Sequence, residues 1–259
     1  MRISAAFDKL NGKKALIAFI TGGDPDIETT EKLILAMEEV GVDLIEIGIP
    51  FSDPIAEGPV IEQADERALK GGCTTDKLFA MVKRLRGKTD IPLLFMTYAN
   101  PVYKYGKDKF MATCREVGID GVIVPDVPFE EKGEFSDACK QHGIDMISLI
   151  APTSGERVEK IAREAEGFLY CVSSVGVTGV RSDISTGIAE LITQVKKVAS
   201  IPCAIGFGIS TPKQAQEMAA ISDGVIVGSA IVDIIARHGK DSIEPVKKFV
   251  REMRVAMDI

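Results

Sequence analysis

The sequence predicts an α/β protein folded as a single (β/α)8 TIM barrel, and three observations lead to this prediction. Short apolar runs alternate with longer amphipathic segments along all 259 residues. About eight such units of roughly 32 residues each match the barrel, which needs about 250 residues. The apolar runs are continuous rather than alternating, as is typical of parallel strands buried on both faces. An open doubly wound sheet fits less well, because the first turn reads TGGDPD and not GxGxxG.

The expected strands are the apolar runs, most of them rich in β-branched residues. They occupy residues 15–21, 43–49, 91–98, 121–127, 145–152, 168–174, 201–208 and 223–230.

The expected helices lie between these strands and have one apolar face. The segment 26–41 places Leu33, Ala36, Met37 and Val40 on one face and stops at Gly41. Several of the others open with Ser, Thr or Asp and close with Gly, the usual asymmetry of helix caps. They occupy residues 74–88, 106–118, 129–143, 154–167, 185–200, 210–222 and 242–258.

The chain shows no linker, no low-complexity segment and no shift in composition. We therefore expect one domain over residues 1–259, with extra short helices at the N-terminus and after strand 8. The net charge of −7 argues against a nucleic-acid partner. The first ten residues do not resemble a signal peptide, and no apolar stretch reaches the roughly 20 residues that span a bilayer. These features predict a soluble, cytoplasmic protein without a membrane partner.

Cysteine and histidine do not form a recognisable site in the sequence. The five cysteines contain no CxxC pair, so we expect core thiols in a reducing compartment. His142 and His238 each precede a glycine near a predicted helix end, where a histidine complements the helix C-terminus. We expect no metal site and no Ser-His-Asp triad.

Three acids gather around the end of the second strand, in LIEIGIPFSDPIAEGP (44–59). Glu46 lies inside an apolar strand, where an unpaired carboxylate is costly. Asp53 and Glu57 follow in the next loop. Because barrel active sites lie at the C-terminal ends of the strands, all three are placed on the chemical face. Glu46 could instead pair with a buried Lys or Arg, Glu57 could be a solvated acid, and Asp53 could form a turn.

Glycine-rich turns follow the last three strands. They read SSVGVTG (173–179), GFGIS (206–210) and GSAIV (228–232). Glycines let backbone N–H groups approach an anion, and a helix N-terminus adds a favourable dipole. The three loops together predict a phosphate site, with Ser229 opening a short extra helix. The alternative is that these glycines only form tight turns.

The strand-2 segment resembles the signature of the tryptophan synthase alpha subunit family. Further matches follow in the family's order over nearly the whole chain, in AFITGGDPD (18–26), TYANPVYKYG (97–106), VPDVPFEE (124–131), SSVGVTGVR (173–181), GFGIS and GSAIV. The resemblance implies a barrel that cleaves indole-3-glycerol phosphate to indole and glyceraldehyde 3-phosphate by a retro-aldol reaction.

The resemblance also implies roles for individual residues. Glu46 matches the catalytic glutamate, and Glu57 stands where the family most often has a catalytic aspartate, so this acid is one methylene longer. Tyr170 matches a tyrosine that lines the site, which we count with the catalytic residues. The expected substrate-binding residues are Phe19 and Met96 at the indole ring, Thr178 on the strand-6 loop, and Gly179, Gly208, Gly228 and Ser229 at the phosphate. Asp53 and Asp126 match positions linked to signalling with the partner.

The resemblance implies no cofactor in this chain. It implies a beta subunit that carries pyridoxal phosphate, in an alpha2-beta2 heterotetramer. The loop 173–186 is expected to close over the substrate as a lid and to be mobile without ligand. Two other functions remain open: a regulatory module of the beta subunit with weak lyase activity, and another phosphosugar barrel such as an isomerase.

Overall fold

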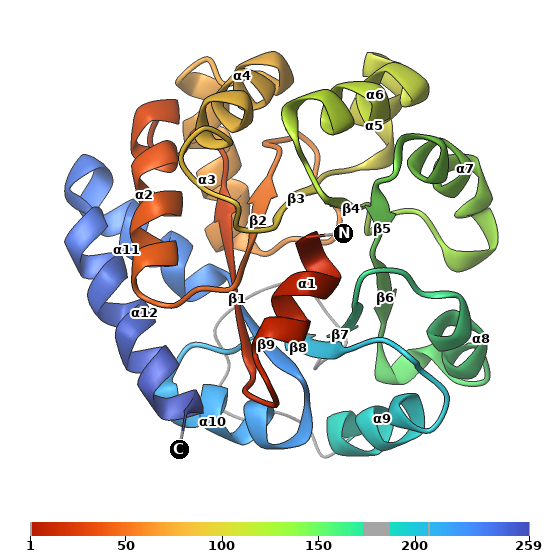
Figure 1. Ribbon diagram of the computed structural model, residues 1–259. Helices are drawn as coiled ribbons and strands as arrows, with labels where there is room; N and C mark the ends of the chain where they lie inside the picture. Colours follow the sequence, from red (N-terminus) through yellow and green to blue (C-terminus); the bar gives the residue numbers. More distant parts are fainter. Residues whose placement is uncertain (1, 173–186, 207, 259) are drawn as a thin grey trace.

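The computed structural model describes residues 2–172, 187–206 and 208–258. Its parallel strands form one nine-stranded sheet in the order β5-β4-β3-β2-β1-β9-β8-β7-β6. The strands form a ring, and helices surround it (Figure 1). The two ends of the sheet, β5 and β6, are consecutive in the chain, so the ring is nearly closed. The predicted barrel is therefore confirmed.

The strands and helices have the following bounds. The strands are β1 (Ala15–Thr21), β2 (Leu44–Gly48), β3 (Leu93–Met96), β4 (Gly121–Ile123), β5 (Asp145–Met146), β6 (Ser148–Ile150), β7 (Leu169–Val172), β8 (Cys203–Gly206) and β9 (Gly224–Val227). The α-helices are α1 (Arg2–Lys9), α2 (Ile27–Glu39), α3 (Pro59–Lys70), α4 (Thr75–Leu85), α5 (Ala99–Tyr105), α6 (Lys107–Val117), α7 (Gly133–His142), α8 (Arg157–Glu164), α9 (Gly187–Lys196), α10 (Pro212–Ile221), α11 (Ser229–His238) and α12 (Ile243–Met257).

The fifth predicted strand, 145–152, is divided into β5 and β6. Ile147 separates the two segments, and its N–H donates to the carbonyl oxygen of Val122 at 2.9 Å. Its side chain is buried in the barrel interior. The break thus lets β5 pair with β4 and β6 pair with β7.

Two helices lie where the sequence predicted only loops. α3 begins at Pro59, directly after the turn that carries Glu57, and α5 begins at Ala99 within TYANPVYKYG. Proline and glycine at their starts resemble turn signals, although Pro at the first helical position is compatible with a helix. The predicted helix at Ser229 is confirmed as α11, and α1 is the expected N-terminal helix.

The barrel has an inner and an outer apolar layer, because successive strand residues point to opposite faces. On β1, Ala15, Ile17 and Phe19 belong to the inner cluster, whereas Leu16, Ala18 and Ile20 pack outward against helices. Further inner residues are Leu44, Leu94, Met96, Ile123, Tyr170, Ala204 and Ile226. Leu44 is inner while Ile45 and Ile47 are outer, so the alternation places Glu46 on the inner face.

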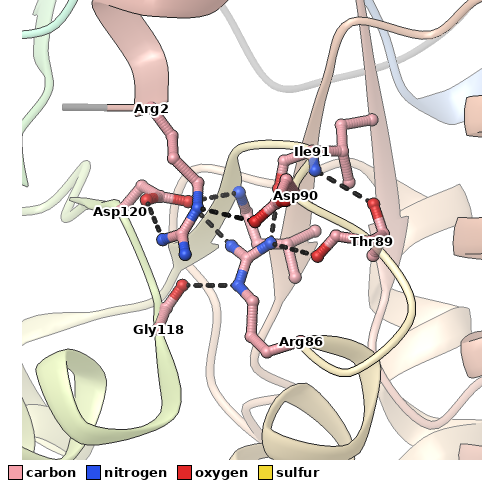
Figure 2. Close-up of polar contacts among 8 residues, drawn as sticks. Arg2, Arg86, Thr89, Asp90, Ile91, Gly118 and Asp120 are labelled. Atoms are coloured by element: carbon pink, nitrogen blue, oxygen red, sulfur yellow. Dashed lines mark hydrogen bonds and ion pairs between the residues drawn. The ribbon is translucent and has the colours of Figure 1, made fainter.

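Helix α1 lies across the centre of the ring of strands in Figure 1. Its Ile3 is buried in the inner cluster, so the helix covers the end of the barrel where the strands begin. Arg2 donates to Asp120 at 3.0 Å, and Asp120 also accepts from Arg86 at 2.7 Å (Figure 2). Arg86 donates further to the carbonyl oxygens of Gly118 and Ile91. This polar network joins α1 to the segments that precede β3 and β4.

Cysteines and histidines lie as predicted. All five cysteines are free and buried, and the two histidines are the last residues of α7 and α11. Within the described residues, no helix is long and apolar enough to cross a membrane.

Candidate active site

Glu46 lies at the inner face of the barrel, in the middle of β2. Its Cα pairs with Phe19 on β1 and with Leu94 on β3. The side chain is 0% exposed, and neither carboxylate oxygen has a hydrogen-bond partner among the described residues. Within that part of the chain, Glu46 is not paired with a buried Lys or Arg, contrary to the alternative left open by the sequence. Removal from water raises the pKa of Glu46 to about 8, so the group holds a proton at neutral pH.

Tyr170 lies on the inner face of β7, close to Glu46. Its side chain is buried, and burial together with the nearby Glu46 carboxylate raises the pKa of the phenol well above its usual value. A Cβ atom at Gly206 on β8 would lie only 2.5 Å from the Tyr170 hydroxyl oxygen. Gly206 therefore makes room for this ring, a role that the sequence analysis did not assign.

Phe19 and Met96, the residues expected at the indole ring, line the same interior. Each is 7% exposed and belongs to the inner apolar cluster. Gly48 follows Glu46 by two residues, and a Cβ atom there would lie 2.8 Å from the Phe19 ring. The absence of a side chain at Gly48 thus lets the ring lie beside the end of β2. An apolar wall next to a buried carboxyl group suits an aromatic ligand.

Glu57 lies in the loop between β2 and α3, and its side chain is 8% exposed. It is a buried group and not a solvated loop acid. One of its carboxylate oxygens, Oε2, is buried and accepts no hydrogen bond from residues 2–172, 187–206 or 208–258. The carboxyl group lies within reach of Asp65 and of the Tyr98 hydroxyl. Burial raises the pKa of Glu57, and the hydrogen bonds with Asp65 and Tyr98 partly offset this effect.

Asp65 on α3 is the acid that sequence reasoning missed. Its side chain is buried, and burial followed by repulsion from Glu57 raises its pKa. A signal was present in the sequence, because Asp65 lies on the apolar stripe of α3 with Ile61, Ala64 and Ala68. An acid within a buried stripe is unusual and indicates a specific partner.

The structure describes only part of the predicted phosphate site. Gly228 is the N-cap of α11 and Ser229 its first residue, so the first-turn N–H groups are at the mouth of the barrel. Gly208 has a φ of +79°, a backbone conformation that favours glycine. The structure brings Gly208, Gly228 and Ser229 to the ends of the adjacent strands β8 and β9. Thr178, Gly179 and the lid expected at 173–186 lie outside the described residues.

Asp53 and Asp126 lie away from the inner carboxylates. Asp53 is exposed and lines a surface hollow of about 570 Å³ together with Lys104, Tyr105 and other residues from the loops after β2 and β3. Asp126 accepts hydrogen bonds from the Ala99 N–H, at 3.0 Å and 3.1 Å to its two oxygens. It thereby fixes the start of α5, which lies beside the hollow.

The fold and the site define a class: a TIM barrel whose mouth holds buried carboxyl groups, an apolar wall and glycine-rich turns. The chain also matches the family model described as tryptophan synthase alpha chain over residues 6–258. The chain belongs to the tryptophan synthase alpha chain family.

Individual relatives agree with this assignment. The tryptophan synthase alpha chain of Lacticaseibacillus casei is 46% identical over 258 residues, which cover 100% of this chain and 97% of the relative. That of Thermoanaerobacter pseudethanolicus is 48% identical over 253 residues, covering 96% and 97%. The solved alpha subunit of Legionella pneumophila superposes with a TM-score of 0.90 at 37% identity, covering 99% and 98%. A chain from the a2b2 complex of Pyrococcus furiosus gives 0.88 at 37% identity, covering 94% and 99%.

Proposed function

We propose that Glu46 and Glu57 divide the proton transfers of indole-3-glycerol phosphate cleavage. Chains of this family catalyse that cleavage, the lyase half-reaction of tryptophan synthase, in tryptophan biosynthesis. The observation that carries the proposal is the pair of buried Glu46 oxygens on the inner face of the barrel, which have no hydrogen-bond partner in the part of the chain that the structure describes. A buried carboxyl group with an open hydrogen-bonding capacity is suited to a substrate that supplies the missing partner.

The chemistry needs three proton movements. The indole carbon that leaves must be protonated, the indole N–H must be polarised or deprotonated, and the side-chain hydroxyl must lose its proton. Glu46 is protonated at neutral pH, so it can donate to the carbon and accept from the hydroxyl. Glu57 is the acceptor for the indole N–H, and Tyr170 lines the site beside Glu46. Phe19 and Met96 supply the apolar wall for the indole ring.

The phosphate group belongs at the glycine-rich turns. Gly208, Gly228, Ser229 and the N-terminus of α11 offer backbone N–H groups to an anion, and Thr178 and Gly179 are proposed to add further contacts. The loop 173–186 is proposed to close over the bound substrate. The proposed mechanism uses no cofactor in this chain.

The beta subunit is the partner of this chain, as in the a2b2 complex of Pyrococcus furiosus. We propose that pyridoxal phosphate is held in that beta subunit. We also propose that residues 1–259 act as one barrel domain in the cytoplasm. Asp53 and Asp126 are proposed to take part in signalling between this chain and the beta subunit. The exposed Asp53 and the contact of Asp126 with α5, both near the hollow, support this assignment.

The first experiment follows indole release from indole-3-glycerol phosphate, by the chain alone and with its beta subunit. We expect wild type to release indole, faster with the beta subunit. Glu57→Asp should retain activity within about 100-fold, because a displacement of about 1 Å can cost about that much. Glu57→Ala should lose more, since no acceptor then faces the indole N–H. A full rate in Glu57→Ala would remove Glu57 from the mechanism, and no release by wild type in either condition would favour the regulatory module.

A further inference from the structure

The acids at the mouth of the barrel include one that the proposed mechanism does not use. Asp65 is buried on α3, eight residues after Glu57, and its carboxyl group faces that of Glu57. Two carboxylates in contact in a buried place repel each other, so such a pair is stable only when it holds one proton. One carboxyl group then carries the proton and donates its O–H, and the other group accepts this hydrogen bond as a carboxylate.

Asp65 also contacts the beginning of the loop that carries Glu57. Its Oδ2 accepts a hydrogen bond from the Phe51 N–H at 3.3 Å. The end of the loop is held from the other side, where the Ala56 N–H donates to the Tyr98 hydroxyl at 3.1 Å. The Phe51 and Tyr98 rings pack against each other with centroids 5.4 Å apart. Asp65 therefore touches both the backbone at the start of the loop and the carboxyl group near its end.

We infer that Asp65 is the positioning residue for Glu57: protonated Asp65 donates its O–H to the Glu57 carboxylate and holds that carboxylate at the indole N–H. The proton stays on Asp65 during the reaction, so Glu57 remains the anionic acceptor. This inference rests on the proposed function, since it presumes that Glu57 faces the substrate. It also explains how a side chain one methylene longer than aspartate is kept in a single place, because both Asp65 and Tyr98 contact it.

Other ionisable groups of the described residues also lie around the pair. Glu62 on α3 adds repulsion at Glu57, and Tyr98 after β3 and Cys73 after α3 are neutral, with a raised pKa. From the loop after β1, Asp24 is paired with Arg67 at 2.8 Å. Helix α11, which contacts α3, carries Asp233 and Arg237, paired with each other at 2.8 Å, and His238 at its end. Burial and Glu57 are the largest causes of the raised pKa of Asp65.

The inference predicts a different result for two substitutions at one position. Asp65→Asn keeps a donor toward Glu57 and cannot ionise, whereas Asp65→Ala removes the donor. In the complex with the beta subunit at pH 7, we expect Asp65→Asn to keep kcat within about 3-fold and Asp65→Ala to lose about 10- to 100-fold. Glu62→Gln is the control, because it removes a nearby exposed charge without a contact to Glu57. It should keep wild-type kcat.

The pH profile of kcat separates positioning from a structural role. Above the pKa of the pair, Asp65 ionises and repels Glu57, so wild type should lose activity that Asp65→Asn retains. Burial and repulsion from Glu57 raise the pKa of Asp65, and above that pKa the difference should grow by about 10-fold per pH unit. Ionisation of Glu46 affects both proteins equally and cancels in the comparison. Equal pH profiles of wild type and Asp65→Asn, or a wild-type kcat in Asp65→Ala, would overturn the inference.

A double substitution and a spectroscopic readout distinguish this inference from the proposed role of Glu57. In a Glu57→Gln background, Asp65→Ala should cost little further activity, because the group that it positions is gone. An equal loss in both backgrounds would make Asp65 structural. If Glu57→Gln alone keeps full activity, the role of Glu57 fails instead. The infrared spectrum of wild type minus that of Asp65→Asn at pH 7 then still reports on the pair. It should contain one protonated-carboxyl band, because the band of Glu46 is present in both proteins and cancels, and the absence of that band would overturn proton sharing.

Discussion

Glu46 shows how a single side chain is made reactive by what surrounds it. Its neighbours on both flanking strands, Phe19 and Leu94, offer no hydrogen bond, so the carboxyl group keeps its proton at pH 7. Such a group can act as an acid toward carbon at a pH where an exposed glutamate is ionised. The barrel supplies this environment by placing the acid on the inner face, with no nearby cation required.

The same environment makes the stability of the barrel depend on pH. The pKa of Glu46 is about 8 when folded, against 4.5 for an exposed glutamate. The native state therefore binds this proton more tightly, and Glu46 lowers the free energy of unfolding as pH rises from 4.5 to about 8. Glu46→Gln lacks this effect. From pH 5 to pH 9, the free energy of unfolding of wild type should therefore fall by about 3–5 kcal/mol more than that of Glu46→Gln.

Denaturant unfolding of both proteins at pH 5, 7 and 9 measures this difference. Parallel stability curves for wild type and Glu46→Gln would show that Glu46 titrates as an ordinary exposed glutamate. The activity of the same variant should fall by about 100- to 10,000-fold, since its amide neither donates nor accepts the reacting proton as an acid does.

At the scale of elements, the loops after β2, β3 and β4 support one another. Tyr98 after β3 holds Ala56 of the β2 loop, and Asp126 after β4 holds Ala99 at the start of α5. The hollow that contains Asp53 lies between the first two of these loops. Hydrogen bonds thus connect the residues around this hollow to the loop that carries Glu57.

Asp126→Ala tests one of these connections. The substitution removes the acceptor at the start of α5, and loss of such a cap costs about 0.5–2 kcal/mol. We expect a lower free energy of unfolding and a weaker stimulation of indole release by the beta subunit. Asp137→Ala on α7 is the matched control, since Asp137 is exposed, and it should change stability by less than about 0.5 kcal/mol. Stimulation equal to wild type in Asp126→Ala would limit this residue to a structural role.

The elements also show what the sequence could and could not predict. Continuous apolar runs predicted the parallel strands, and the unit length predicted the barrel, because both are set by local pattern. The helix α3 was missed because its start, Gly58 and Pro59, resembles a turn. The role of Asp65 could not be predicted, since it depends on a contact across a loop. The break at Ile147 could not be predicted either, because it depends on the pairing of β5 and β6 with different neighbours.

At the scale of the whole molecule, the two ends of the barrel have different tasks. At the mouth, Glu46, Glu57 and Asp65 are buried acids that pair with no cation among the described residues, which lowers stability, whereas the opposite end holds a satisfied network of charges. There Asp120 joins Arg2 of α1 to Arg86, whose side chain is only 11% exposed (Figure 2). Asp120 also accepts from the Leu93 N–H at 3.0 Å. The charged network at this end therefore contributes to stability and not to chemistry.

Asp120→Asn should destabilise the fold and spare the reaction. The change leaves the guanidinium of Arg86 partly buried without a counter-charge, which costs about 3 kcal/mol. Urea unfolding should show this loss, while kcat of the folded variant stays at the wild-type value. Asp90→Asn is the control: its carboxylate is 95% exposed and lies 3.6 Å from Arg2, so its loss should cost less than about 1 kcal/mol. A large drop in kcat of Asp120→Asn would show that this network affects the reaction at the mouth.

Both ends of the described chain are anchored on the side away from the mouth. Arg2 is held by Asp120 before β4, and Arg254 of α12 is held by the carbonyl oxygen of Lys14 before β1. A dye, an affinity handle or a surface linker attached at either end would thus leave the substrate entrance and the hollow near Asp53 unobstructed. The molecule can be immobilised by the side away from the mouth while the mouth stays accessible to a partner in solution. Binding can then be followed on a sensor surface without redesigning the chain.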